Sequence, residues 1–143
     1  MLDHDFIKRK VSLIENELMV LTKYKDMTFE ETAKDFETQA IVERLLERII
    51  TRAIDINNHI IAEAGTHLKS VAKYRETFLR LADLDIYPKE FAEKIAPSAG
   101  FRNSLVHDYN NLDKNILKKS LKEAIEEFNE YGKYILSYIV KKG

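Results

Sequence analysis

The stretch ETQAIVERLLERIITRAIDINNHIIAEA, Glu37 to Ala64, carries the clearest structural signal in this chain. Apolar residues recur in it at every third or fourth position, a spacing that places their side chains on one face of an α-helix. Those residues are Val42, Leu45, Ile49, Ala53, Ile56 and Ile60. Gly65 follows, and glycine is common just past a helix end. We therefore expect one long amphipathic helix whose apolar face is covered by other helices.

The first part of the chain shows the same spacing, and it predicts a helix that ends near Tyr24. The apolar stripe of this helix consists of Ile7, Val11, Ile14, Leu18 and Leu21. Thr28 followed by Glu31 is a capping box. A short helical turn, or the lead-in to the long helix, is therefore expected to begin at Thr28.

Two prolines divide the second half of the chain. Ser70 can cap a third helix ahead of them; its stripe is Val71, Tyr74, Phe78 and Leu81. Pro88 is expected as the first residue of a fourth helix. Pro97 has no amide hydrogen to donate, so the fourth helix is expected to kink or restart there. Asp113 can cap a fifth helix that runs almost to the end; its stripe is Leu117, Leu121, Ala124, Phe128, Ile135 and Ile139.

Five amphipathic helices with short connections predict an all-α antiparallel bundle, because no segment shows the two-residue alternation of a strand. The chain has only four glycines and two prolines in 143 residues, fewer turn residues than sheet-rich folds need. Its length fits one domain with a substantial core, so we expect residues 1–143 to form a single helical domain.

The composition excludes several classes of protein. With 23 basic and 24 acidic residues the net charge is -1, so no overall field attracts nucleic acid or a membrane. The absence of cysteine excludes disulfides and thiolate chemistry. The start of the chain mixes charges among its apolar residues and lacks the continuous apolar run of a signal peptide or membrane span. We therefore expect a cytoplasmic protein with no membrane partner.

The histidines suggest neither a metal site nor a bound cofactor. No helix carries the Glu-x-x-His pairs of di-metal bundles, and no glycine-rich phosphate loop is present. Asp55 and His59 lie one turn apart on the long helix and have the spacing to share a ligand or a proton. The favoured alternative is a partly buried His59 that is hydrogen-bonded to that aspartate or to the backbone.

The stretch GFRNSLVHDY, Gly100 to Tyr109, gathers polar residues just beyond the break at Pro97. On a straight helix Arg102 and Tyr109 lie about 20° apart, whereas His107 lies about 140° from Arg102. The arginine and the histidine therefore converge only in two ways. Either the helix unwinds near its end, or two copies of the chain pack about a two-fold axis and pool their side chains.

These residue types suit phosphodiester chemistry. A histidine transfers protons near neutral pH, and a permanently charged arginine stabilises the extra charge on a phosphoryl group. RNA supplies its own nucleophile, the 2′-hydroxyl. A structural explanation stays open, because Arg102 and His107 can bind carbonyls at a helix end and Tyr109 can be a core residue. Spacing alone favours that structural explanation, since short motifs often match by chance.

Several segments together resemble a known family. The motif is arginine, any four residues, histidine, any one residue and tyrosine, and AGF precedes it. AIDINNHIIAEAG, Ala53 to Gly65, and YRETFLRLADLDIYPKEFAEKIA, Tyr74 to Ala96, carry the same resemblance. On these residues the chain resembles the HEPN superfamily, and most closely the HepT-like proteins that pair with minimal nucleotidyltransferases. Pro97 is a departure, because related chains commonly carry an ordinary helix former there.

The resemblance implies an all-helical homodimer that acts as a toxin ribonuclease on RNA, either tRNA or mRNA. The motifs of both subunits would line a cleft at the interface and need no metal or cofactor. Carried over by position, Arg102 stabilises the phosphoryl charge, His107 transfers a proton and Asn103 is a polar assistant. Tyr109 matches the tyrosine that the partner nucleotidyltransferase, the antitoxin, adenylylates to silence the toxin.

Asp55 and His59 fall in the matching segment of the long helix, so the resemblance suggests that they line or brace the same cleft. Two further functions remain open. One is a non-catalytic subunit that binds a nucleotide or a substrate for a nucleotidyltransferase, because the same motif can hold a phosphate without cleaving anything. The other is a structural dimerisation bundle.

Overall fold

The computed structural model of the protein describes residues 1–64, 73–100 and 121–142. These residues contain helices and no strand, which confirms the all-α prediction for this part of the chain. The helices are α1 (His4–Leu21), α2 (Phe29–Thr32), α3 (Phe36–Ala64), α4 (Tyr74–Asp83), α5 (Lys89–Ile95) and α8 (Leu121–Lys142), with a 3-10 turn, η1 (Thr22–Tyr24), after α1.

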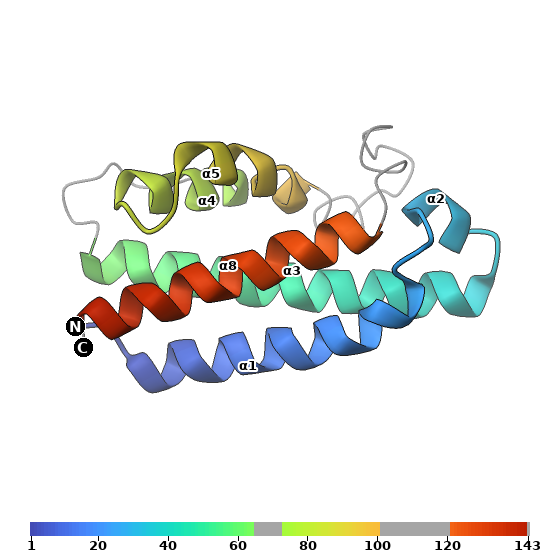
Figure 1. Cartoon of the computed structure of the whole chain (residues 1–143), viewed down its shortest axis with the longest axis horizontal. Helices are drawn as coiled ribbons and strands as arrows, with labels where there is room; N and C mark the ends of the chain where they lie inside the picture. The colour runs from blue at the N-terminus through green and yellow to red at the C-terminus, as the bar shows by residue number, and fades with distance from the viewer. Residues whose placement is uncertain (65–72, 101–120, 143) are drawn as a thin grey trace.

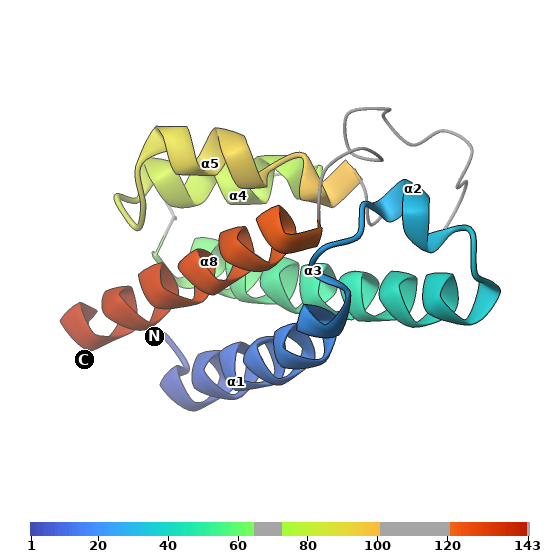
Figure 2. The same ribbon diagram turned by 45° about the vertical axis from the view of Figure 1, so that its right-hand side comes forward.

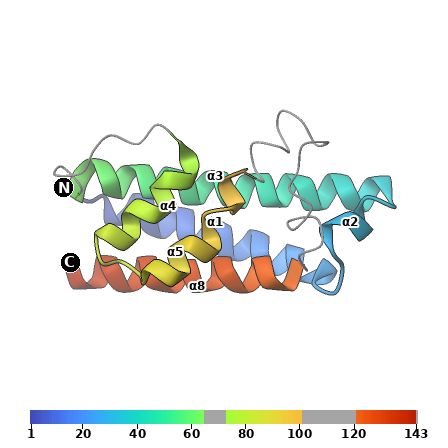
Figure 3. The same cartoon turned by 90° about the horizontal axis from the view of Figure 1, so that it is seen from above.

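Five helices close a ring around the core (Figure 1). Helix α1 packs between α3 and α8, α4 packs against α3, α5 packs against α4, and α5 reaches α8 to complete the ring. Helices α1, α3 and α8 are the long members, and α1 runs opposite to the other two (Figure 1). The shorter α4 and α5 lie across α3 and α8 (Figure 3). The predicted bundle of amphipathic helices is therefore present.

The amino-terminal elements form as their sequence predicts. Asp3 caps α1 by accepting a hydrogen bond from the amide of Phe6 at 3.0 Å. Helix α1 ends at Leu21 and η1 continues to Tyr24, as expected. The capping box is present, because Thr28 and Glu31 each accept the other's amide at 3.0 Å. The hydrogen bonds from Thr28 also lower the pKa of Glu31.

Helix α3 confirms the long helix and corrects one member of its stripe. Leu46 is 3% exposed, whereas the predicted Leu45 is half-buried. The reason is angular, because Leu46 follows Val42 by four residues and precedes Ile49 by three. It therefore sits in the middle of the apolar face, and Leu45 sits at the edge.

Helices α4 and α5 begin later than their sequence suggests. Helix α4 starts at Tyr74 after Lys73, whose side chain makes no capping hydrogen bond, and the predicted cap Ser70 lies outside the described residues. Pro88 precedes α5 as its N-cap, with an extended ψ of 153°, so the prediction that it is the first helical residue is wrong. The break at Pro97 is confirmed, because α5 ends at Ile95 and the backbone is helical again from residue 98.

The fifth predicted helix is α8 over its described part, from Leu121 to Lys142. The predicted residues Leu121, Phe128, Ile135 and Ile139 are buried in it. Asp113 and Leu117 lie outside the described residues. None of the described helices is both long and apolar enough to cross a membrane.

A chain of buried hydrogen bonds links three helices through Asn57, which is 0% exposed. The hydroxyl of Tyr131 in α8 donates to Asn57 Oδ1 in α3 at 2.5 Å, and Asn57 Nδ2 donates to Thr77 Oγ1 in α4 at 3.0 Å. Thr77 in turn donates to the carbonyl of Tyr74 at 2.7 Å. Burial raises the pKa of Tyr131, so its hydroxyl remains protonated and able to donate. Every group in the chain is paired, as buried polar groups must be.

Replacing Asn57 tests the importance of this chain of hydrogen bonds. Asn57→Ala would remove one hydrogen-bond partner from each of two buried hydroxyls, and would leave Tyr131 only the carbonyl of Ala53 at 3.0 Å and Thr77 only that of Tyr74. We expect the free energy of unfolding, measured in urea, to fall by about 1–3 kcal/mol. The matched control is Asn58→Ala, one residue along the same helix and exposed, which should change it by less than about 0.5 kcal/mol. Equal losses in the two variants would contradict the assignment.

Candidate active site

The motif residues Arg102, Asn103, His107 and Tyr109 lie in 101–120, outside the described residues. Their convergence therefore remains a prediction. The structure does describe the two points at which the chain enters and leaves this stretch.

The chain enters the motif from a buried anchor. Ala96 is 0% exposed and Ala99 is 1% exposed, so this segment is packed into the core. The amide of Ala99 donates to the carbonyl of Ala96 at 3.1 Å. The amide of Gly100 donates to the carbonyl of Pro97, also at 3.1 Å. The backbone is therefore held in a tight helical turn up to the residue that precedes Phe101.

The chain leaves the motif at a second anchor. Leu121 is 3% exposed, and its amide donates to the carbonyl of Met27 at 3.0 Å. The amide of Lys122 donates to the carbonyl of Lys25 at 3.1 Å. The loop between η1 and α2 therefore fixes the beginning of α8. Both flanks of the motif are attached to the folded core.

Asp55 and His59, the other candidate residues, both bond to α1. Asp55 Oδ2 pairs with Lys10 Nζ at 3.1 Å, and His59 Nε2 accepts the backbone amide of Asp3 at 2.9 Å. The His59 ring also lies 5.2 Å from the ring of Phe6, centroid to centroid. His59 therefore uses Nε2 to accept a hydrogen bond from the backbone.

These contacts show how His59 is bonded, whereas its cleft-lining role stays a prediction. No hydrogen bond joins Asp55 to His59 in the described part of the chain, so the structure does not bring them together as a pair. The alternative in which a partly buried His59 bonds to the backbone is confirmed. Among the described residues no group of three or more His, Asp or Glu side chains is placed to hold a metal ion.

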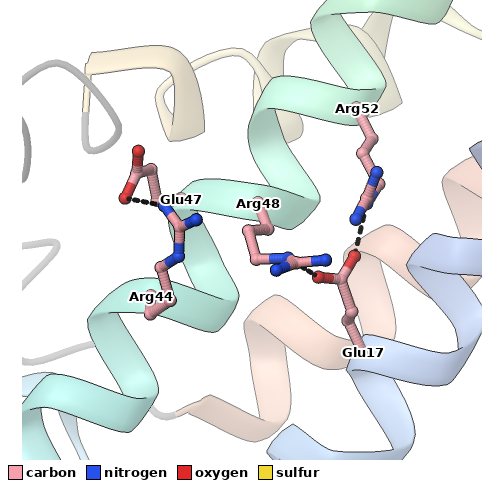
Figure 4. A network of polar contacts seen from close by, with 5 residues as sticks. All are labelled: Glu17, Arg44, Glu47, Arg48 and Arg52. Atoms are coloured by element: carbon pink, nitrogen blue, oxygen red, sulfur yellow. Dashed lines mark hydrogen bonds and ion pairs between the residues drawn. The ribbon is translucent and has the colours of Figure 1, made fainter.

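A buried carboxylate between two arginines is the strongest charged contact between α1 and α3. Figure 4 shows Glu17 of α1 accepting from Arg48 Nε and from Arg52 Nε, each at 2.5 Å. The Glu17 side chain is 11% exposed, whereas Arg44 and Glu47 nearby form a more exposed pair at 3.3 Å. The sequence carries no signal for this contact, because the apolar stripe of the first helix is complete without Glu17.

Comparison with known proteins identifies the family of this chain. A family model described as "Ribonuclease HepT-like" matches residues 14–135, a range that includes the motif. The chain belongs to the HepT-like ribonuclease family. Membership in this family confirms the resemblance on which the candidate site rests.

Two HepT-like relatives are known nucleases. The tRNA nuclease HepT of Aphanizomenon flos-aquae is 37% identical over 136 residues, which cover 94% of this chain and 90% of that protein. The mRNA nuclease HepT of Shewanella oneidensis is 28% identical over 98 residues, which cover 68% of this chain and 72% of that protein.

The HepT-like fold is also seen in a solved structure. The tri-AMPylated HEPN toxin of Shewanella oneidensis, in complex with its MNT antitoxin, has a TM-score of 0.78 and 24% identity to this chain. The similarity covers 94% of this chain and 99% of that one. The described helices therefore have the same fold as that protein.

The buried ion pairs of Glu17 with Arg48 and Arg52 should contribute more to the free energy of unfolding than the more exposed pair of Arg44 and Glu47. Glu17→Gln removes the negative charge shared by Arg48 and Arg52, so we expect the free energy of unfolding to fall by about 1–3 kcal/mol. Glu47→Gln, the control, removes a more exposed pair within one helix and should cost less than about 0.5 kcal/mol. Urea unfolding at low and high salt measures both, and a larger loss in the control would reject the buried role of Glu17.

Proposed function

We propose that this HepT-like chain is the toxin of a toxin–antitoxin pair and a metal-independent endoribonuclease. The observation that carries the proposal is the family match across residues 14–135, which spans the stretch with Arg102, His107 and Tyr109. Identity of 37% to a tRNA nuclease over 94% of the chain supports it. In this proposal residues 1–143 act as one helical domain in the cytoplasm, on tRNA or mRNA.

The proposed reaction uses the RNA's own 2′-hydroxyl. Its oxygen attacks the neighbouring phosphorus while a base removes its proton, and the bond to the 5′ oxygen of the next nucleotide breaks as that oxygen gains a proton. His107 transfers a proton, Arg102 stabilises the added phosphoryl charge, and Asn103 assists as a polar contact. The products are a cyclic phosphate and a free 5′-hydroxyl.

A homodimer completes this machinery. The reaction needs both an acid and a base, and the motif supplies one histidine per chain. A two-fold dimer places a second His107 in the same cleft. The proposal therefore treats the dimer as the active unit.

Asp55 and His59 have a bracing role in the proposal. The bonds from Lys10 to Asp55 and from Asp3 to His59 hold α3 against α1. His59 Nε2 is already occupied as an acceptor, so this nitrogen is not free to take a proton from RNA. Both residues would then support the cleft from behind and take no part in the chemistry.

Adenylylation of Tyr109 is the proposed means of silencing the toxin. On the helix expected from the sequence, Tyr109 lies about 20° from Arg102. An attached AMP adds bulk and negative charge beside the arginine, in the space that an RNA phosphate needs. The similar fold of an AMPylated HEPN toxin bound to an MNT antitoxin supports a nucleotidyltransferase as the partner.

RNA cleavage in the presence of EDTA tests the proposed activity. The purified chain should cut RNA after metal removal, because the proposed acid, base and cation are all side chains. His107→Ala should lower the rate by about 10²–10⁴, and Arg102→Ala by about 10²–10³. Gel analysis of labelled tRNA and mRNA measures each rate, and circular dichroism checks the fold.

His59→Gln is the matched control, because glutamine keeps an acceptor for the Asp3 amide. It should cleave RNA close to the wild-type rate. A wild-type chain that is inert towards both RNAs but still binds nucleotide would instead establish a non-catalytic binding subunit. Loss of cleavage in His59→Gln would move His59 into the chemistry.

The partner's modification of Tyr109 can be observed directly by mass. Co-expression with a neighbouring nucleotidyltransferase should add one or more AMP-sized increments to the intact chain, and peptide mapping should place them on Tyr109. Tyr109→Phe should abolish the increments. Tyr74, an exposed tyrosine of α4, serves as an internal control and should stay unmodified. Increments on Tyr74, or none with an active partner, would reject this regulation.

A further inference from the structure

A groove separates α8 from the turn that joins α4 to α5. Its volume is about 440 Å³, within the range of about 300–1,000 Å³ common for small-ligand pockets. Figure 2 shows this turn close to the carboxyl-terminal part of α8. The residues lining the groove that matter for its chemistry are Asp85, Tyr87, Tyr134, Ser137, Tyr138 and Lys141.

Aromatic rings form fixed walls of this groove. The Tyr87 hydroxyl donates to the carbonyl of Phe78 at 2.6 Å, which holds that ring in place. Tyr134 packs edge-on against Tyr87 with a centroid distance of 5.7 Å, and lies 5.1 Å from the ring of Phe91. The half-buried Tyr134 therefore presents an aromatic surface that the core already orients.

The polar groups of the groove are not used by the rest of the described chain. Within the described residues, the side chains of Asp85, Tyr134, Ser137 and Lys141 make no hydrogen bond or ion pair. Asp85 also has a φ of 60°, a left-handed backbone conformation that few residues other than glycine adopt. This conformation ends α4 in the usual way, because the amide of Asp85 donates to the carbonyl of Ala82 and the amide of Ile86 to the carbonyl of Leu81, each at 3.0 Å.

The two lysines at the end of α8 lie on different sides of Tyr138, and only Lys141 lines the groove. Lys142 Nζ lies 5.8 Å from the centre of the Tyr138 ring. Lys141 lines the groove itself, so two adjacent lysines follow Tyr138 at the end of α8. The groove thus combines aromatic surfaces, hydroxyls, one carboxylate and one cation, Lys141, within a small space.

We propose that this groove binds one unpaired nucleotide of the RNA substrate, at a distance from the cleavage motif. The base stacks on Tyr134, as single-stranded bases do on aromatic side chains. Asp85 and Ser137 hydrogen-bond to the edge of the base, and Lys141 pairs with the phosphate of the same nucleotide. The inference rests on the proposed ribonuclease function and names a binding site for that substrate.

The position of the groove sets what kind of RNA can use it. Lining residues Tyr134 to Lys141 follow Leu121, where the described part of α8 begins, by 13 to 20 positions. At 1.5 Å per residue this is about 20–30 Å along the helix. An RNA that extends from Leu121, where the chain leaves the motif stretch, to the groove must be several nucleotides long. The site therefore favours long single-stranded segments over very short ones.

The test uses an uncleavable probe on the full-length chain. A single-stranded oligoribonucleotide, 2′-O-methylated at every sugar and carrying 4-thiouridine, is crosslinked by light and the adduct is located by peptide mapping. We expect adducts on the peptide that contains Tyr134 and Tyr138. Lys141→Glu should abolish most of this crosslink.

Lys133→Glu is the matched control, since Lys133 is an exposed lysine of the same helix that does not line the groove. It makes the same charge change and should leave the crosslink unchanged. In cleavage assays with long RNA, Lys141→Glu should raise KM about tenfold with kcat unchanged. Tyr134→Leu, checked for folding by circular dichroism, should raise KM by a similar factor.

Each outcome either supports the groove or overturns it. Adducts elsewhere, or equal effects of Lys141→Glu and Lys133→Glu, overturn it even if RNA is cleaved. Protection of the groove by the nucleotidyltransferase alone, without an RNA adduct, makes it a protein-docking surface and also overturns it. Adducts at Tyr134 without any cleavage by the wild type support the groove while rejecting the ribonuclease.

Discussion

Asn57 is the constraint on which the arrangement of the helices depends. It is 0% exposed on the buried face of α3, where an unpaired amide would be costly. Its hydrogen-bonding partners come from two other helices. Tyr131 and Thr77 meet this demand, and they fix how α8 and α4 face α3. Apolar burial drives the helices together, and this one amide selects their register.

Ion pairs and one backbone hydrogen bond join α3 to the amino-terminal segment. Glu17, Lys10 and Asp3 of the amino-terminal segment each bond to a different turn of α3 in antiparallel order. These contacts explain why α1 and α3 lie side by side along most of α1. Ala99 and Leu121, the buried residues on either side of the motif stretch, attach it to this set of packed helices. A rigid scaffold with reactive residues on an attached segment is a common arrangement for catalytic sites.

The sequence predicted those parts of the fold that are local. Helical spacing found α1 and α3, and the Thr28 and Glu31 pair found the start of α2, because caps and stripes depend only on residues within a turn of one another. Pro88 was misplaced by one position, since proline fixes φ but leaves ψ to the surroundings. The partners of Asn57 and Glu17 could not be predicted, because they are brought together from distant helices. The candidate site came from the family resemblance, and spacing alone did not single it out.

The two ends of the chain lie together, at the end of the molecule where α1 begins and α8 finishes (Figure 1). The amino group of Met1 pairs with Glu63, and Met1 and Lys142 line one shallow groove of about 510 Å³. Tyr138 lines this groove and the nucleotide groove alike. A short linker can therefore join the two ends, which gives a circular permutant whose new termini lie at another point of the chain. For the same reason a purification tag at either end stands beside the proposed nucleotide groove and can block it, so an untagged chain is the proper one for RNA experiments.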